Sequence, residues 1–279
     1  MKAAAAIGLA VACWLVAPCA AAAELVFADP AGDDTGPGTY VYPSDVAYLP
    51  GSFDLRRVEL RDVGDQVEVR VTLGAEIQDP WDSRAWDGNG FSLQMIQIYL
   101  DTAPGDGVRD ALPGIDASFA ADDAWDRVVL IAPQGVRRLR EEVARKAPGL
   151  RDRIVLPSKV SVDGRALLVR VPRKALGGGV SARWGVQVLV CGDDPFVGEG
   201  NLLVRPVNAL AGQHRFGGGV DAACEPQVLD LLAAPAVGGA AEVAAQRAML
   251  AYACAAGGAE ARSAVLTMVR QQASVPKGR

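Results

Sequence analysis

The chain has 279 residues, of which 50% are hydrophobic and 22% charged, and its formal net charge is −5. This length is enough for a full hydrophobic core, in one large all-β domain or in two small ones. The acidic balance, the mixed charge signs and an aromatic content of 6% leave no basic stripe, which argues against nucleic-acid binding.

The first 23 residues have the pattern of a secretory signal peptide. Lys2 gives a positive start, residues 3–17 form an apolar run, and the three alanines at 21–23 offer a small-residue cleavage site. We therefore expect residues 24–279 to be secreted or periplasmic, without a membrane span after cleavage.

Two other fates for this N-terminal segment are less favoured. A retained membrane anchor would need a longer apolar run than the one before Pro18. A lipoprotein modified at Cys19 would need a small residue where Pro18 stands.

Three cysteines remain after the signal segment, at Cys191, Cys224 and Cys254. In an oxidising compartment one pair can form a disulfide, and we expect Cys191 to pair with Cys224 because both lie near predicted strand or loop ends. No C-x-x-C motif occurs, so nothing supports a zinc knuckle, thioredoxin-like redox chemistry or covalent haem attachment.

Hydrophobic periodicity predicts mainly strands. Residues 24–56 are rich in turn-forming Gly, Pro and Asp. After them, period-two alternation predicts two hairpins, and three further apolar runs predict buried strands. The hairpins are 58–61 with 67–73, around Gly64-Asp65, and 154–162 with 166–171, around Asp163-Gly164; the buried strands are 93–100, 127–132 and 184–190.

Helices are predicted at only two places, residues 136–146 and 240–253, and residues 263–270 are ambiguous between helix and strand. Hairpins dominate and βαβ alternation is absent, so the pattern favours an all-β, antiparallel β-sandwich with short helical additions. No linker rich in Pro or Ser divides the chain, which indicates one domain over residues 24–279.

The densest polar cluster of the sequence is the loop that contains Asp29, Asp33 and Asp34. Calcium prefers six to eight oxygen ligands, and Asp54 and Asp101, each near a strand end, could complete a site with these three. The spacing is not that of an EF-hand loop. The competing interpretation is a pair of Asx-turns without a metal.

Four tryptophans follow the signal segment. Trp81 and Trp86 lie in the polar, glycine-containing stretch DPWDSRAWDGNG, where binding to sugar rings and burial in the core are equally supported. Trp125 and Trp184 are flanked by predicted strands, and for them a core position is favoured.

Catalytic chemistry has little support in the sequence. His214 is the only histidine, which excludes a three-histidine zinc site, and no G-x-S-x-G elbow is present. His214 could ligate haem together with Met95, but a solvated loop histidine is favoured. The adjacent carboxylates, Asp122-Asp123, Glu141-Glu142 and Asp193-Asp194, do not form a convincing facing pair for a glycosidase.

Several blocks nevertheless occur in a familiar order. They are FADPAGDDTGPGTYVYP, SFDLRRVEL, DPWDSRAWDGNGFSLQMIQIYLD, RPVNALAGQHRFGGGVDAACEPQVLDLL and QRAML followed by Tyr252. Over residues 25–253 the chain resembles the C-terminal module of bacterial glucodextranase, and through it family 9 carbohydrate-binding modules and DOMON-like sandwiches. Residues 254–279 would then form a C-terminal tail.

The resemblance implies an immunoglobulin-like β-sandwich that binds carbohydrate or anchors enzymes at the cell envelope, without catalysis of its own. It also strengthens the expectation of a structural calcium ion at the Asp29 loop. The expected partners are a polysaccharide or oligosaccharide, with a glycoside hydrolase or an envelope protein as a further partner. Departures from the family pattern are His214-Arg215 before the Phe-Gly-Gly-Gly block and a charged insertion at 134–150.

The sequence therefore predicts an exported, non-catalytic protein that binds glycan through Trp81 and Trp86. The alternatives are a haem-binding DOMON-like redox protein and a structural, protein-binding envelope domain; an enzyme is the least favoured class.

Overall fold

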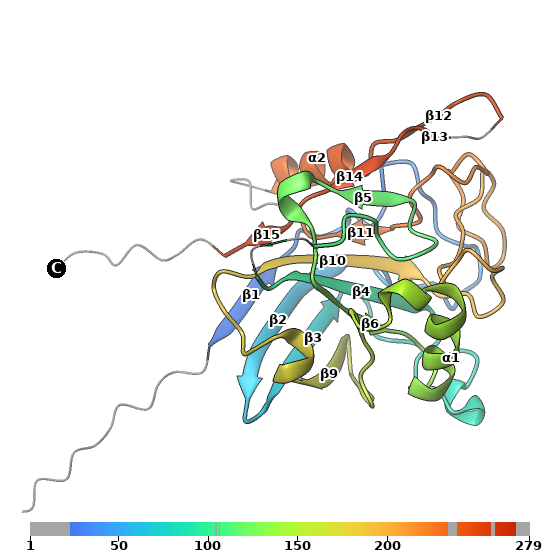
Figure 1. The fold of residues 1–279 in the computed structure, drawn as a ribbon. Helices are drawn as coiled ribbons and strands as arrows, with labels where there is room; N and C mark the ends of the chain where they lie inside the picture. The colour runs from blue at the N-terminus through green and yellow to red at the C-terminus, as the bar shows by residue number, and fades with distance from the viewer. Residues whose placement is uncertain (1–22, 104, 106, 234–238, 258–259, 272–279) are drawn as a thin grey trace, which may run out of the picture.

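A computed structural model describes residues 23–271 except 104, 106, 234–238 and 258–259 (Figure 1). The predicted signal peptide therefore lies outside the described residues, apart from Ala23. Among the residues that are described, no helix is long and apolar enough to cross a membrane.

The chain folds mainly into strands, as the periodicity predicted. The strands are β1 (Glu24–Ala28), β2 (Leu55–Val63), β3 (Gln66–Leu73), β4 (Gln94–Asp101), β5 (Ala117–Phe119), β6 (Arg127–Ile131), β7 (Ile154–Val155), β8 (Val160–Asp163), β9 (Ala166–Pro172), β10 (Gly185–Gly192), β11 (Asp230–Leu231), β12 (Ala253–Cys254), β13 (Glu260–Arg262), β14 (Ala264–Leu266) and β15 (Val269–Arg270). The α-helices are α1 (Val136–Lys146) and α2 (Gly239–Met249), and the short 3-10 turns are η1 (Ser83–Trp86), η2 (Ala121–Asp123), η3 (Pro148–Leu150) and η4 (Arg173–Leu176).

Two larger sheets form the sandwich. The first has the order β1-β2-β3-β9-β8; the second has the order β11-β10-β4-β6-β7, with β15 also paired to β10. Both predicted hairpin turns are present: Val63 pairs with Gln66, Asp163 pairs with Ala166, and Gly64 and Gly164 take the positive φ that tight two-residue hairpin turns require. The predicted antiparallel all-β sandwich is confirmed.

The second sheet is covered on both faces. In β4, Ile96, Ile98 and Leu100 face the core between the sheets, whereas Met95 and Tyr99 face a second apolar cluster. Because neighbouring side chains of a strand point to opposite faces, this two-sided cover explains why β4 is a nearly continuous apolar run rather than an alternating one.

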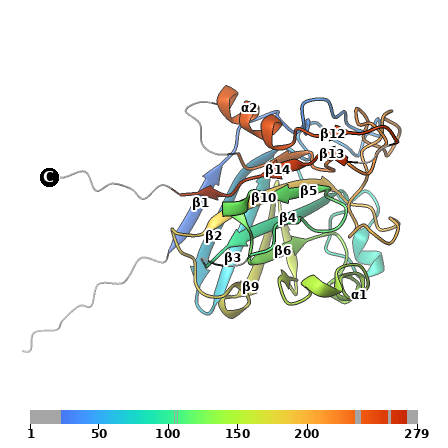
Figure 2. The same cartoon turned by 45° about the horizontal axis from the view of Figure 1, so that its top comes forward.

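The cover of the outer face comes from segments far apart in the chain. The second cluster includes Leu139 and Val143 of α1, Trp125 before β6, Met249 of α2 and Leu266 of β14. Figure 2 shows β5, β14 and α2 on this side of the sheet and α1 at one end of the sandwich.

Several boundaries differ from the sequence-based prediction. Strand β1 lies inside the turn-rich segment 24–56, and α2 ends at Met249 rather than 253. The ambiguous segment 263–270 forms strands, so part of the predicted tail 254–279 packs into the fold: β14 pairs with β5, and β15 with β10. The β5–β14 and β6–β7 pairs are parallel, unlike the rest.

The predicted Cys191–Cys224 disulfide is wrong. Cys224 is bonded to Cys254, with a Cα–Cα distance of 5.8 Å, and Cys191 is a free thiol. Cys191 lies inside the central strand β10, fully buried in the second apolar cluster, and burial raises the pKa of its thiol. Cys224 and Cys254 instead lie in segments that meet outside the two larger sheets.

Candidate functional site

The tryptophan loop, residues 79–92, connects β3 to β4 and is organised by one carboxylate. Asp79 accepts hydrogen bonds from the backbone N–H of Ser83 (2.9 Å) and from the Ser83 hydroxyl (2.9 Å), and it also accepts one from the hydroxyl of Ser92. The Ser83 hydroxyl in turn accepts the N–H of Gly90 (2.8 Å). Both ends of the loop are therefore fixed to the carboxylate of Asp79.

The middle of this loop is tied to the second sheet. The side-chain amide of Asn89 donates to the carbonyls of Ala132 (2.9 Å) and Gln134 (3.0 Å), which follow β6. Asp82 and Asp87, at the two ends of η1, take positive φ values of 45° and 66°, which Asp tolerates better than most residues. A loop fixed in this way holds its side chains in place before a ligand arrives.

Trp81 and Trp86 lie at one pocket of about 500 Å³. Both indoles are partly exposed, 39% for Trp81 and 40% for Trp86, and the Trp86 indole N–H donates to the Trp81 carbonyl. Phe196, from the segment after β10, lines the same pocket and is 91% exposed. The full lining is Trp81, Trp86, Ser92, Arg138, Asp193, Pro195, Phe196, Arg205 and His214.

An aromatic cluster supports Trp81 from behind. The ring of Trp81 packs edge-on against Tyr48, at a centroid distance of 6.3 Å, and against His214, at 5.8 Å. Tyr48 packs in turn against Phe53 and Phe216, which belong to the core between the sheets. The pocket wall is therefore continuous with the rigid interior.

Polar groups in the pocket are also held from behind. The carboxyl of Asp193 is almost completely buried; one oxygen accepts the side-chain amide of Gln134 at 2.8 Å and the other has no partner. Burial raises the pKa of Asp193 well above its usual range, against the effect of the Gln134 bond. Arg205 donates to the carbonyls of Asp193 and His214, each at 2.9 Å. The pocket thus combines three aromatic faces with fixed donors and acceptors.

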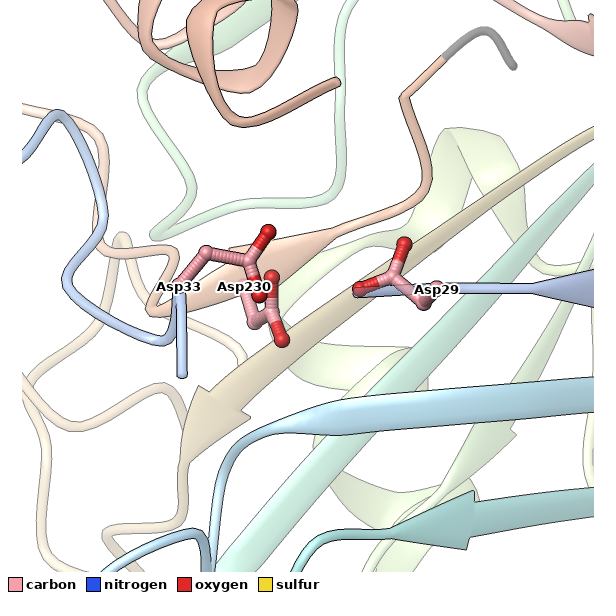
Figure 3. Close-up of side chains that lie close together, drawn as sticks. All are labelled: Asp29, Asp33 and Asp230. Carbon is pink, nitrogen blue, oxygen red and sulfur yellow. The ribbon is translucent and has the colours of Figure 1, made fainter. Parts of the chain in front are cut away.

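A second group of side chains lies elsewhere, at the end of β1. Oxygens of Asp29, Asp33 and Asp230 all lie within 4.8 Å of one another (Figure 3). Asp29 follows β1, Asp33 lies in the next loop and Asp230 begins β11. The sequence pointed to Asp29 and Asp33, but not to Asp230, which is some 200 residues away in an apolar stretch.

Two more predicted ligands border this cluster, and a further acidic residue joins it. Asp54 accepts the N–H of Gly32 at 3.1 Å, and Asp34 accepts the hydroxyl of Tyr42. Glu242 of α2 lies near Asp33. Burial, and after it the charge of Asp33, raises the pKa of Glu242 to about 7. Nothing in the sequence marked Glu242, because it lies in a helix whose position depends on the folded chain.

Asp101 does not belong to this cluster. It ends β4 and forms an ion pair of 2.6 Å with Arg270 of β15. The prediction that Asp101 is a calcium ligand is therefore wrong. A position near a strand end does not show at which end of the sandwich the residue lies.

The other candidate residues take ordinary positions. Trp125 is fully buried and Trp184 is 4% exposed, as expected for core residues. His214 lines the tryptophan pocket, whereas Met95 is fully buried in the second apolar cluster and does not line that pocket. The structure thus does not bring the two suggested haem ligands to this cavity.

One pair of adjacent carboxylates is engaged in ion pairs. Glu141 and Glu142 are on α1 and contact cations of the same helix: Glu142 lies 3.1 Å from Lys146. In the tryptophan pocket, Asp193 is the one carboxylate among the described lining residues, and a glycosidase requires two.

The chain matches a known family of binding modules. Residues 25–267 match the model of the C-terminal binding module, SLH-like, of glucodextranase. The match covers both large sheets except Glu24 and β15, and it includes every residue of the tryptophan pocket and of the Asp29 cluster. No curated protein matches the chain.

Proposed function

The chain belongs to the family of C-terminal binding modules of glucodextranase, and from this premise we propose that it is a non-catalytic protein that binds glycan at the pocket of Trp81 and Trp86. The observation that carries the proposal is the pair of partly exposed indoles at a pocket of about 500 Å³, on a loop fixed at both ends. Aromatic side chains that remain exposed on a rigid support are typical of binding sites.

The chemistry of the pocket suits a sugar. The apolar faces of sugar rings stack on indole and phenyl rings, and Trp86, Trp81 and Phe196 offer such faces. Hydroxyl groups need donors and acceptors around the ring, and Arg138, Arg205 and Ser92 of the pocket lining carry such groups. The volume is within the range of small-ligand pockets, so the bound unit is a short stretch of the glycan.

The same premise supports an extracellular role. A signal-peptide pattern precedes Glu24, and a disulfide joins Cys224 to Cys254, as is common in oxidising compartments. We propose that the protein is exported and binds an envelope or extracellular polysaccharide, with a glycoside hydrolase or an envelope protein as its further partner. The absence of a second carboxylate in the described pocket lining supports binding without hydrolysis.

The test is retention on insoluble polysaccharides by a chain that begins at Glu24. We expect retention on an α-glucan or a wall polysaccharide, and a loss of at least tenfold in affinity, about 1.4 kcal/mol, for the double variant Trp81→Ala/Trp86→Ala. Val265→Ala is the matched control, because Val265 is also a partly exposed apolar residue but lies on β14. Retention of the double variant at the level of the wild type would refute the site.

A further inference from the structure

The Asp29 cluster is a buried set of carboxylates that the proposed glycan site does not use. It contains Asp29, Asp33 and Asp230, with Glu242 beside them, and shares no residue with the tryptophan pocket. Asp29 is 7% exposed, Asp33 2% and Asp230 0%. Figure 3 shows the three side chains directed toward a common region, from β1, its following loop and β11.

The members of the cluster differ in how their oxygens are satisfied. Asp230 accepts one backbone N–H on each oxygen, from Leu55 at 2.6 Å and from Leu231 at 2.9 Å. In contrast, both oxygens of Asp29 and both oxygens of Asp33 are buried without any hydrogen-bond partner among the described residues. Buried carboxylates are normally paired or coordinate a metal, because burial without a partner is costly. The described residues therefore supply no hydrogen-bonding partner for the carboxyl groups of Asp29 and Asp33.

A bound cation would supply the missing partner. Glu242, the fourth carboxylate, also has one buried oxygen without a hydrogen-bond partner. It therefore adds to the number of unpartnered carboxylate oxygens. The nearby cation Arg56 is 38% exposed and lies 3.6 Å from Asp54, at the border of the cluster. A single guanidinium at the border does not offset four buried carboxylates.

The ligand set and the spacing favour calcium. All four candidate side chains offer oxygen, which hard cations such as calcium prefer, whereas zinc and copper are more often bound by nitrogen or sulfur ligands. Ligands on opposite sides of one calcium ion stand about 4.6 to 5.2 Å apart, since each Ca–O bond is about 2.3 to 2.6 Å. The oxygens of Asp29, Asp33 and Asp230 lie within 4.8 Å of one another. Magnesium needs shorter bonds in a regular octahedron and retains several water ligands, which a buried cluster of carboxylates suits less well.

We propose that Asp29, Asp33 and Asp230, with Glu242 as a fourth ligand, bind one structural calcium ion. The ion would join three segments that are distant in sequence: the loop after β1, strand β11 and helix α2. Two hydrogen bonds already bring these segments together, from the Gly36 N–H to the Leu229 carbonyl (2.8 Å) and from the Gln246 amide to the Asp33 carbonyl (2.6 Å). Glu242 and Gln246 are four residues apart on α2 and thus face the same loop. The proposal is independent of the glycan site.

The test compares thermal unfolding and calcium titration calorimetry for chains that begin at Glu24. We expect the wild type to bind calcium with a ratio of one per chain and to unfold at a higher temperature with calcium than with chelator, while magnesium at the same concentration produces little shift. Asp29→Asn and Asp33→Asn should each weaken calcium binding at least a hundredfold and abolish the shift. Asp101→Asn is the matched control, because Asp101 is an aspartate at a strand end that is paired with Arg270, and it should retain both properties.

The variants also separate metal binding from a purely structural role. In chelator, Asp29→Asn replaces a buried carboxyl group that has no hydrogen-bond partner, so it should unfold no earlier than the wild type. A loss of stability that is equal with calcium and with chelator would overturn the proposal. If either variant does not fold, native mass spectrometry of the wild type decides: one calcium per chain that chelator removes supports the site, and its absence after calcium addition refutes it. Equal binding of magnesium would refute the assignment to calcium.

Discussion

Asp79 shows how a single residue positions the proposed sugar-binding surface. Its carboxylate accepts hydrogen bonds from the beginning of η1 and from Ser92, which precedes β4. Trp86 lies between these two anchors and Trp81 lies between Asp79 and Ser83, so the orientation of both indoles depends on a side chain that does not itself line the pocket. Affinity that rests on such preorganisation is lost when the support is removed, even if the contact residues remain.

Replacing Asp79 should therefore impair binding through the loop. For Asp79→Ala we expect glycan affinity to fall about tenfold, because Trp81 and Trp86 lose their fixed positions, and stability to fall by about 1–3 kcal/mol, because Ser83 and Ser92 lose their acceptor. Affinity electrophoresis and chemical denaturation measure the two effects. Asp82→Asn is the control: Asp82 is exposed, and Asn also tolerates its positive φ of 45°. Unchanged affinity for Asp79→Ala would contradict this role.

Residue type and local sequence pattern predicted some of the site residues. Two tryptophans in a polar, glycine-containing stretch indicated the loop, and strand flanks indicated that Trp125 is in the core. Phe196, Asp230 and Glu242 could not be found in this way, because each becomes part of a site only when segments more than 100 residues apart pack together. Asp101 shows the opposite error: its residue type suits calcium, but the fold places it away from the Asp29 cluster, beside Arg270.

At the scale of elements, long alternating strands were predictable and short ones were not. The hairpins β2–β3 and β8–β9 repeat period two over several residues around a Gly-containing turn, so both the strands and their connection were evident. Strands β14 and β15 have three and two residues. Such segments have no measurable periodicity, and their conformation is decided by the strands with which they pair, β5 and β10.

The disulfide has a clear energetic role at this scale. It closes a loop of 30 residues that contains β11 and α2, the two elements that contribute Asp230 and Glu242. Closing a loop of this length lowers the entropy of the unfolded chain, so Cys224→Ser/Cys254→Ser should lose about 3–4 kcal/mol in chemical denaturation. Reductant should destabilise the wild type similarly and leave the double variant unaffected.

Thiol titration checks the pairing itself. Without reductant, a chain that begins at Glu24 should show no reactive thiol when folded and one when denatured, because Cys191 is fully buried. Burial also raises the pKa of this thiol and thereby suppresses the reactive thiolate. Three reactive thiols in denaturant would contradict the Cys224–Cys254 bond.

For the molecule as a whole, the arrangement of carboxylates predicts an unusual pH dependence. Burial, followed by neighbouring carboxylates, raises the pKa of Asp29 to about 10. Burial also raises that of Glu242 to about 7 and that of Asp54 to about 6. Because these values exceed those of the unfolded chain, the folded state binds more protons, and its stability falls as the pH rises through them.

In chelator, we therefore expect the unfolding temperature to decrease between about pH 5 and pH 10. Calcium should reduce this decrease, since a cation takes the place of the protons, so its stabilising effect should grow with pH. Thermal scans at several pH values with calcium and with chelator measure the difference. A calcium effect that is constant from pH 6 to pH 9 would count against the Asp29 cluster as its origin.

Quenching of tryptophan fluorescence by acrylamide would show whether glycan covers Trp81 and Trp86. In a chain that begins at Glu24, these two indoles are about 40% exposed, whereas Trp125 and Trp184 are buried. We predict that a glycan that the protein retains will protect the quenchable part of the emission, and that the protection will vanish in Trp81→Ala/Trp86→Ala. Binding of that glycan without any change in quenching would show that the sugar lies elsewhere and would refute a binding site at Trp81 and Trp86.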